Sequence, residues 1–137
     1  MSFFCAIRVA HPHGVEVARV DVMLTFVTVA GEIEQPFRVD TGAYITTVSE
    51  DVAARCELPT GGPPIPVSGV GGQVTGRLVD VRCRFPPDAL SGTDGLEADF
   101  RWVVIPGNTK TALLSLADVH RHFSIGTDDA YMHFAER

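Results

Sequence analysis

The chain has 137 residues, a formal net charge of −6 at pH 7, 45% hydrophobic residues and 20% charged residues. This size and composition are typical of one globular domain that can bury a core without disulfides or metal ions. The negative charge and the single lysine, Lys110, argue against nucleic acid as the main partner, because phosphate binding needs clustered Lys and Arg side chains.

The cysteines and the apolar segments indicate where the protein resides. Cys5, Cys56 and Cys83 are an odd number without the spacing of a disulfide framework or a zinc site, which favours a reducing compartment. No apolar run approaches the ~18 residues that a membrane span needs. Arg8 interrupts the apolar N-terminus before the core of a signal peptide could form. We therefore expect a soluble, cytoplasmic protein that does not bind membranes.

The first half of the chain predicts a hairpin and a short helix. Two strands, residues 22–29 and 32–39, flank the turn at Ala30-Gly31. The second strand leads directly into Asp40-Thr41-Gly42-Ala43. Ser49 is predicted to cap a short helix that ends near residue 56.

A glycine-rich hairpin is predicted next. Residues 60–66 are rich in Gly and Pro and predict a loop. The loop leads to a hairpin tip that consists of Gly69, Val70, Gly71 and Gly72. A strand with period-two alternation follows over residues 74–85, with a bulge or a bend near Gly76. Residues 86–99 predict an inserted surface loop or a loose hairpin.

Two more strands and a second helix close the chain. Residues 100–105 and 112–115 predict strands, and residues 116–123 predict a helix. Ser115 is placed as the N-cap of this helix, and Asp118 lies three residues further on, as in a capping box.

The order of these elements resembles the retropepsins, a family of aspartic proteases. The resemblance is carried by the single Asp-Thr-Gly-Ala at Asp40, the glycine-rich hairpin, and the paired aliphatic residues Leu113-Leu114 before the last helix. Pepsin-type relatives carry two such motifs in a chain more than twice as long. The resemblance covers roughly residues 20–134.

The resemblance implies a fold, an activity and a set of site residues. The fold is mainly β, a closed β-barrel of the acid protease type with two short helices, over residues 1–137 as a single domain. The activity is that of an aspartic endopeptidase that works as a homodimer on an extended peptide, with no metal and no organic cofactor. The implied catalytic residues are Asp40, Thr41 and Gly42, and the implied substrate-binding residues are Ala43, Gly69, Val70, Gly71 and Gly72.

The residue types fit this chemistry. Two carboxyls a few ångströms apart share one proton, so one can act as a base on water while the other donates a proton to the substrate. Asp40 supplies one carboxyl, and a second chain must supply the other. An Asp before Thr-Gly can also simply begin a turn through a bond from its side chain to the backbone.

The chain departs from the viral retropepsins at two places. Viral members typically have an Asp where this chain has Tyr44, and Gly-Arg where it has Ser115-Leu116. Both members of the viral ion pair are therefore absent together. A second hypothesis follows, in which the protein is a retropepsin-fold binding or dimerisation module with weak or no catalysis.

Overall fold

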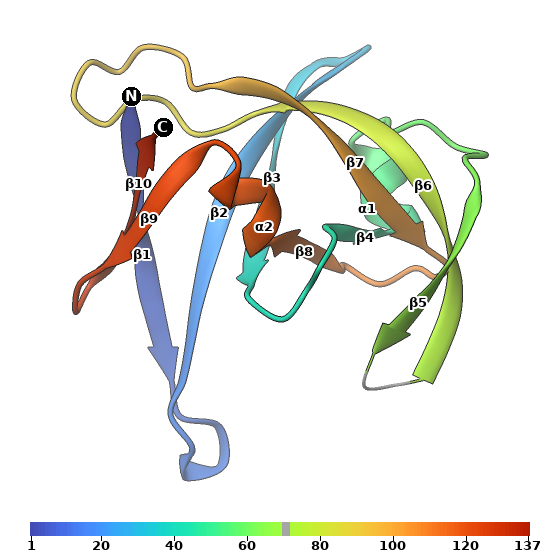
Figure 1. Cartoon of the computed structure of the whole chain (residues 1–137), viewed down its shortest axis with the longest axis horizontal. Helices are drawn as coiled ribbons and strands as arrows, with labels where there is room; N and C mark the ends of the chain where they lie inside the picture. Colours follow the sequence, from blue (N-terminus) through green and yellow to red (C-terminus); the bar gives the residue numbers. More distant parts are fainter. Residues whose placement is uncertain (70–71) are drawn as a thin grey trace.

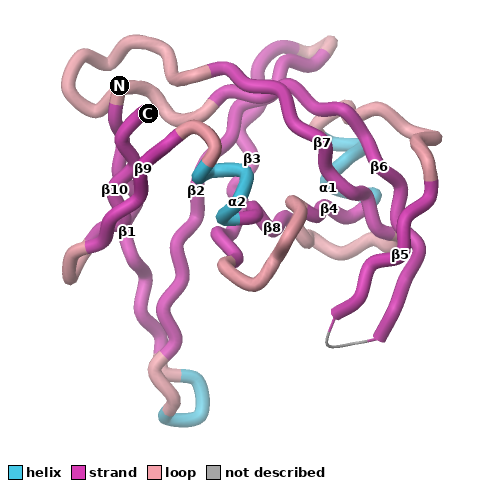
Figure 2. Tube along the Cα trace, in the orientation of Figure 1, coloured by secondary structure: helices cyan, strands magenta, loops and turns pink. Residues whose placement is uncertain are grey.

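The computed structural model describes residues 1–69 and 72–137, and most of them lie in strands (Figures 1 and 2). The strands are β1 (Ser2–Ala10), β2 (Val17–Thr28), β3 (Gly31–Asp40), β4 (Thr47–Ser49), β5 (Pro64–Gly69), β6 (Gly72–Arg84), β7 (Glu97–Ile105), β8 (Ala112–Ser115), β9 (Phe123–Thr127) and β10 (Tyr131–Glu136). The helices are α1 (Glu50–Arg55) and α2 (Leu116–His120), with a 3-10 turn at Pro12–Gly14.

The strands form one sheet that closes on itself. Their order is β5-β6-β7-β4-β8-β3-β2-β1-β10-β9, and β6 also pairs with β2 through Thr25 and Arg84. This extra pairing joins β6, β7, β4, β8, β3 and β2 into a ring, which confirms the predicted closed, mainly β fold. The β1–β2 hairpin, the β5–β6 hairpin and the loop between β3 and β4 project toward the same side of the molecule (Figure 1).

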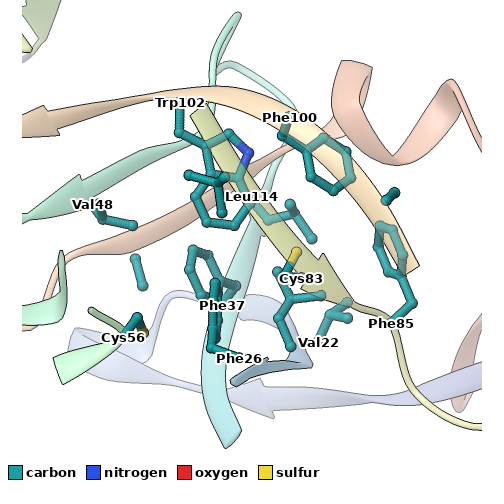
Figure 3. Packing of buried hydrophobic residues seen from close by; sticks show 14 of the residues in the cluster. Val22, Phe26, Phe37, Val48, Cys56, Cys83, Phe85, Phe100, Trp102 and Leu114 are labelled. Carbon is teal, nitrogen blue, oxygen red and sulfur yellow. The ribbon is translucent and has the colours of Figure 1, made fainter. Parts of the chain in front are cut away.

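The core fills this ring, and alternation along the strands explains its composition. On β2, Val22, Leu24 and Phe26 are buried, while the residues between them are exposed or half-buried. Phe37 and the fully buried Trp102 pack against each other with ring centroids 5.2 Å apart (Figure 3). Large aromatic side chains in such contacts stabilise a sheet well beyond their backbone pairing.

Both helices begin at the predicted caps. The Val52 N–H donates to Ser49 Oγ at 3.3 Å at the start of α1, and the Ala117 N–H donates to Ser115 Oγ at 3.2 Å at the start of α2. The capping-box prediction for Asp118 is wrong, because its carboxylate accepts a hydrogen bond from Thr46 instead. Helix α2 ends at His120, earlier than predicted, because the chain turns there into β9.

β1, β4 and β9 were not predicted as strands. β1 pairs with β10 through residues 2–6 and with β2 through residues 7–10, and β10 pairs with β9. These strands form an extension of the sheet beside the ring (Figure 1). The apolar N-terminus is thus a strand between β2 and β10, and Phe3 is buried there.

The predicted glycine-rich hairpin is formed by β5 and β6. Pairing runs without an extra residue from Pro64 and Arg77 to Gly69 and Gly72, so that, of the bulge or bend expected near Gly76, the bulge is absent. Gly76 is required for a different reason: a Cβ there would lie 2.4 Å from the side chain of Val103. Val70 and Gly71 lie outside the described residues.

Among the helices of residues 1–69 and 72–137, none has the length and apolar character to cross a membrane.

Candidate active site

Asp40 is the last residue of β3, at the point where β3 and β8 run parallel to each other. β3 pairs in parallel with β8, so that Asp40 lies opposite Ser115. The chain then forms the 41–46 loop and returns as β4, which pairs with β8 and β7. Asp40 is half-buried, while Thr41 and Gly42 are exposed. The carboxyl of Asp40 is therefore partly accessible to solvent, and the pairing of β3 with β8 fixes the backbone of this residue.

The carboxylate of Asp40 is held by its own loop. The Gly42 N–H donates to Asp40 Oδ1 at 2.9 Å, and the Ala43 N–H donates to the Asp40 carbonyl at 3.4 Å. The turn that was the alternative interpretation of Asp-Thr-Gly is thus present. It does not compete with a chemical role, because it fixes one carboxylate oxygen and leaves the other without a described hydrogen bond.

A buried polar network ties the 41–46 loop to β8 and α2. Thr46 Oγ1 donates to Asp118 Oδ2 at 2.6 Å and accepts from the Ser115 N–H at 2.9 Å. Ser115 Oγ donates to the Ala43 carbonyl at 2.8 Å. Thr46 and Ser115 are fully buried and Asp118 is nearly so. Buried polar groups that satisfy one another in this way hold a loop in a single conformation.

This network lies next to Tyr44 and Leu116 along the chain, since Ser115 Oγ donates to the carbonyl of Ala43. The carboxylate of Asp118 accepts the Thr46 hydroxyl on Oδ2, and the guanidinium of Arg121 lies 3.9 Å from its Oδ1. The Ser115 side chain is fully buried and takes no exposed surface beside Asp40. It therefore supports the loop without adding exposed surface.

Tyr44 follows Ala43 in the chain, and Leu116 follows Ser115. Ala43 and Ser115 are joined by the hydrogen bond from Ser115 Oγ. Tyr44 is 66% exposed and Leu116 is half-buried. Each of these two residues therefore leaves apolar surface accessible to solvent, close along the chain to residues that support the Asp40 loop.

The other residues predicted for the site lie in two places. Ala43 is in the 41–46 loop, whereas Gly69 and Gly72 end the described parts of β5 and β6 and pair with each other. Val70 and Gly71, between them, are outside the described residues.

Thr46 and Asp118 were missed as site residues. The signal was weak: Thr46 lies in a mixed segment of polar and apolar residues, and Asp118 fitted a local capping pattern. Their contact spans 72 positions of sequence, and local patterns do not encode a pairing at that distance.

None of the three cysteines, all of which lie within the described residues, is activated as a nucleophile. Burial raises the pKa of Cys5 and of Cys56 to about 11, and burial also raises the pKa of Cys83. Thiols with raised pKa values are protonated at neutral pH and react slowly. Within the part of the chain that the structure describes, no group of three or more His, Cys, Asp or Glu side chains is arranged to hold a metal ion.

Comparison with known proteins bears on the fold and the family. Residues 25–116 match the family model described as aspartyl protease, which covers more than half of the chain. Among solved structures, the chain is similar to a retropepsin-like aspartic protease from Rickettsia conorii, with a TM-score of 0.55 and 13% sequence identity. That likeness covers 98% of this chain and 90% of the other, and it shows a shared fold. No curated protein matches in sequence.

Proposed function

Because the chain belongs to the aspartyl protease family, we propose that it is an aspartic endopeptidase, a hydrolase that cleaves peptide bonds through Asp40. Residues 1–137 act as one retropepsin-like domain in this proposal. The observation that carries it is the position of Asp40 within the matched residues: it ends β3, lies opposite Ser115 of β8, and receives the Gly42 N–H on one oxygen.

The proposed active form is a homodimer with two-fold symmetry. One chain offers one Asp40 and one β5–β6 hairpin, and an isologous contact is the common way to double a surface. The exposed Tyr44 ring and Leu116 are the proposed contact beside the active site. Sedimentation at micromolar protein should detect a dimer, and a monomer that persists with a peptide inhibitor present would contradict this.

The mechanism follows from the paired carboxyls. Two Asp40 side chains a few ångströms apart repel each other when both are ionised, so the proposed pair holds one proton between them. The ionised carboxyl takes a proton from water as the water attacks the peptide carbonyl, and the protonated carboxyl donates to the carbonyl oxygen. No metal or organic cofactor takes part in this scheme.

The neighbouring residues have supporting roles in the proposal. The Thr41 hydroxyl, which is exposed in one chain, bonds to the backbone of the partner. Gly42 supplies its N–H to Asp40, and Ala43 leaves room for the substrate backbone. The hairpin tip at Gly69, Val70, Gly71 and Gly72 covers an extended peptide, which binds as an added strand.

The test is hydrolysis of an unstructured protein substrate between about pH 4 and about pH 7, where a singly protonated pair is active. We expect a statine-type transition-state analogue to inhibit it. Asp40→Asn should abolish cleavage while the fold is kept, and Asp94→Asn in an exposed loop is the matched control. Cleavage by Asp40→Asn at the rate of the unchanged protein would refute the assignment.

The second candidate, a binding or dimerisation module with weak or no catalysis, is separated by the same experiment. The module would bind the statine-type compound or a peptide, or form the dimer, without any cleavage over the whole pH range.

A further inference from the structure

A cavity with four basic side chains in its lining reaches Arg38, two residues before Asp40 on β3. Its volume is about 760 Å³, and it is enclosed by the start of β2, by β3, by α1 and by the segment that leads into β8. A cavity of this size is in the usual range for a ligand site. Its position and its charge together indicate what it binds.

The register of the strands joins the cavity to the candidate active site. Arg38 lines the cavity and lies two residues before Asp40 on β3, so the two side chains are on the same face of the strand. Arg38 pairs with Leu113, which also lines the cavity, and Asp40 pairs with Ser115, two residues further along β8. Two residues of a strand span ~7 Å. A peptide that crosses Asp40 can therefore reach the cavity with a neighbouring side chain.

The lining carries an excess of positive charge. The cationic residues are Arg19, Arg38, Arg55 and Lys110, and the anionic residues are Asp21 and Asp51. Four cations against two carboxylates leave an excess of two positive charges, in a chain whose net charge is −6.

Most of this charge is uncompensated. Arg19 forms an ion pair with Asp21 at 2.9 Å. Among the described residues, Arg55 donates only to neutral acceptors, the side-chain oxygen of Gln35 and the carbonyl of Glu34. Arg38 and Lys110 form no ion pair within residues 1–69 and 72–137.

We propose that this cavity binds an acidic side chain, Asp or Glu, of the substrate, close to the bond that is cleaved. The inference rests on the proposed protease function, since it names the substrate class of that site. A guanidinium binds a carboxylate through two parallel hydrogen bonds, and Arg38 is an exposed Arg placed to do so. A basic cavity on an otherwise acidic protein concentrates the attraction for an anionic group at one place.

The test begins with binding. The Asp40→Asn variant keeps the cavity and removes the proposed cleavage, so the affinity for short unstructured peptides can be measured directly. The peptides are matched pairs with Glu or Gln at one position at a time. We expect the Glu peptide to bind roughly tenfold more tightly at one position, and this preference to shrink as NaCl is raised.

Substitutions in the cavity show which of its side chains cause the preference for Glu over Gln. In the Asp40→Asn background, Arg38→Gln should remove the preference for Glu, and Lys110→Gln, on an exposed loop, should lower it severalfold. Arg101→Gln is the matched control, because Arg101 is an exposed residue of β7 that pairs with Asp80 outside the cavity. If Arg38→Gln does not fold, the effect of Lys110→Gln on the preference for Glu tests the inference instead. A preference that is unchanged in the folded variants would overturn the inference.

Cleavage by the unchanged protein separates the two claims. If it cleaves Glu and Gln peptides at equal rates at every position, the inference is wrong and the protease function stands. If it cleaves no peptide, the protease function fails, and the binding comparison still decides the cavity: equal affinities overturn it, and a preference for Glu that depends on Arg38 supports it.

Discussion

The 41–46 loop and the β5–β6 hairpin project from the same side of the molecule but are held in opposite ways. The loop is fixed by buried side chains: Thr46, Ser115 and Asp118 satisfy one another's hydrogen bonds out of contact with water. The hairpin is held chiefly by its own backbone pairing, and residues 72–75 of β6 are exposed. A rigid base beside a hairpin with few core contacts is the arrangement expected where a ligand enters and is then covered.

The largest expected effect comes from breaking the network of the loop. Thr46→Val keeps the shape but removes the donor to Asp118 and the acceptor of the Ser115 N–H. A buried carboxylate without its partner is costly, so we expect unfolding to require about 2–4 kcal/mol less. The measurement is urea unfolding followed by the fluorescence of the single, buried Trp102.

Thr75→Val in the hairpin is the matched control for this variant. Thr75 is an exposed residue of β6, and the same change there should alter stability by less than about 0.5 kcal/mol. Equal losses at Thr46 and Thr75 would show that the two regions are not held differently.

The second test concerns the outer side of the loop. Tyr44 and Leu116 offer an apolar contact to the partner in the proposed dimer, where viral relatives use charges. Leu116→Arg should weaken the dimer by tenfold or more, because it buries a charge without a partner. The dissociation constant of the unchanged protein should be nearly the same in about 0.05 M and about 0.5 M NaCl, since salt screens charges and not apolar burial.

Two results of the sedimentation experiment would show that another surface holds the chains together. One is a dimer that weakens tenfold in high salt, and the other is a Leu116→Arg protein that dimerises normally. Leu90→Arg is the control, because Leu90 is 93% exposed in the loop before β7.

The third test is at the base of the hairpin. Gly76 is buried, and a Cβ there would lie 2.4 Å from a methyl group of Val103 and 3.1 Å from the Val104 carbonyl. Gly76→Ala should therefore destabilise the fold by about 1–3 kcal/mol through overpacking. Gly126→Ala, where a Cβ would meet nothing within 4 Å, is the control and should change little. A Gly76→Ala protein as stable as the control would mean that the hairpin base adapts freely.

The contrast between the two regions also explains what the sequence could predict. Alternation along β2 and β3 and the caps at Ser49 and Ser115 are local signals, and the structure follows them. Together with the motif at Asp40 they were sufficient for the fold class and for the position of Asp40. The pairing of β1 with β10 and the bond from Thr46 to Asp118 join distant residues, and nothing in the local sequence specifies them.

Asp118 shows why a correct local rule can fail. A Ser followed three residues later by an acid fits a capping box, but helix α2 is short and packed, and the buried Thr46 hydroxyl competes successfully for the carboxylate. Tertiary contacts override local preferences where burial makes a hydrogen bond more valuable.

The smallest expected effect is at Asp88, a half-buried residue whose hydrogen bonds lie at the surface, in contrast to the buried bond from Thr46 to Asp118. Its carboxylate accepts hydrogen bonds from the Ser2 N–H and from the N–H and hydroxyl of Ser91, and the Ser2 bond, the largest cause, with those from Ser91 lowers the pKa of Asp88 to about 2. A carboxyl whose pKa is lowered in the folded state stabilises it above its unfolded pKa of ~3.9, and this contribution is lost as the pH falls toward 2. Asp88→Asn should therefore lower the melting temperature at pH 6 and make little difference near pH 2.

Asp129→Asn, at an exposed Asp whose side chain forms no described hydrogen bond, is the control. Because water can still reach the half-buried Asp88 carboxylate and compete for it, the loss at pH 6 should be well below that of Thr46→Val. A loss as large as that of Thr46→Val, or one that is independent of pH, would show that burial is not what distinguishes the two ties.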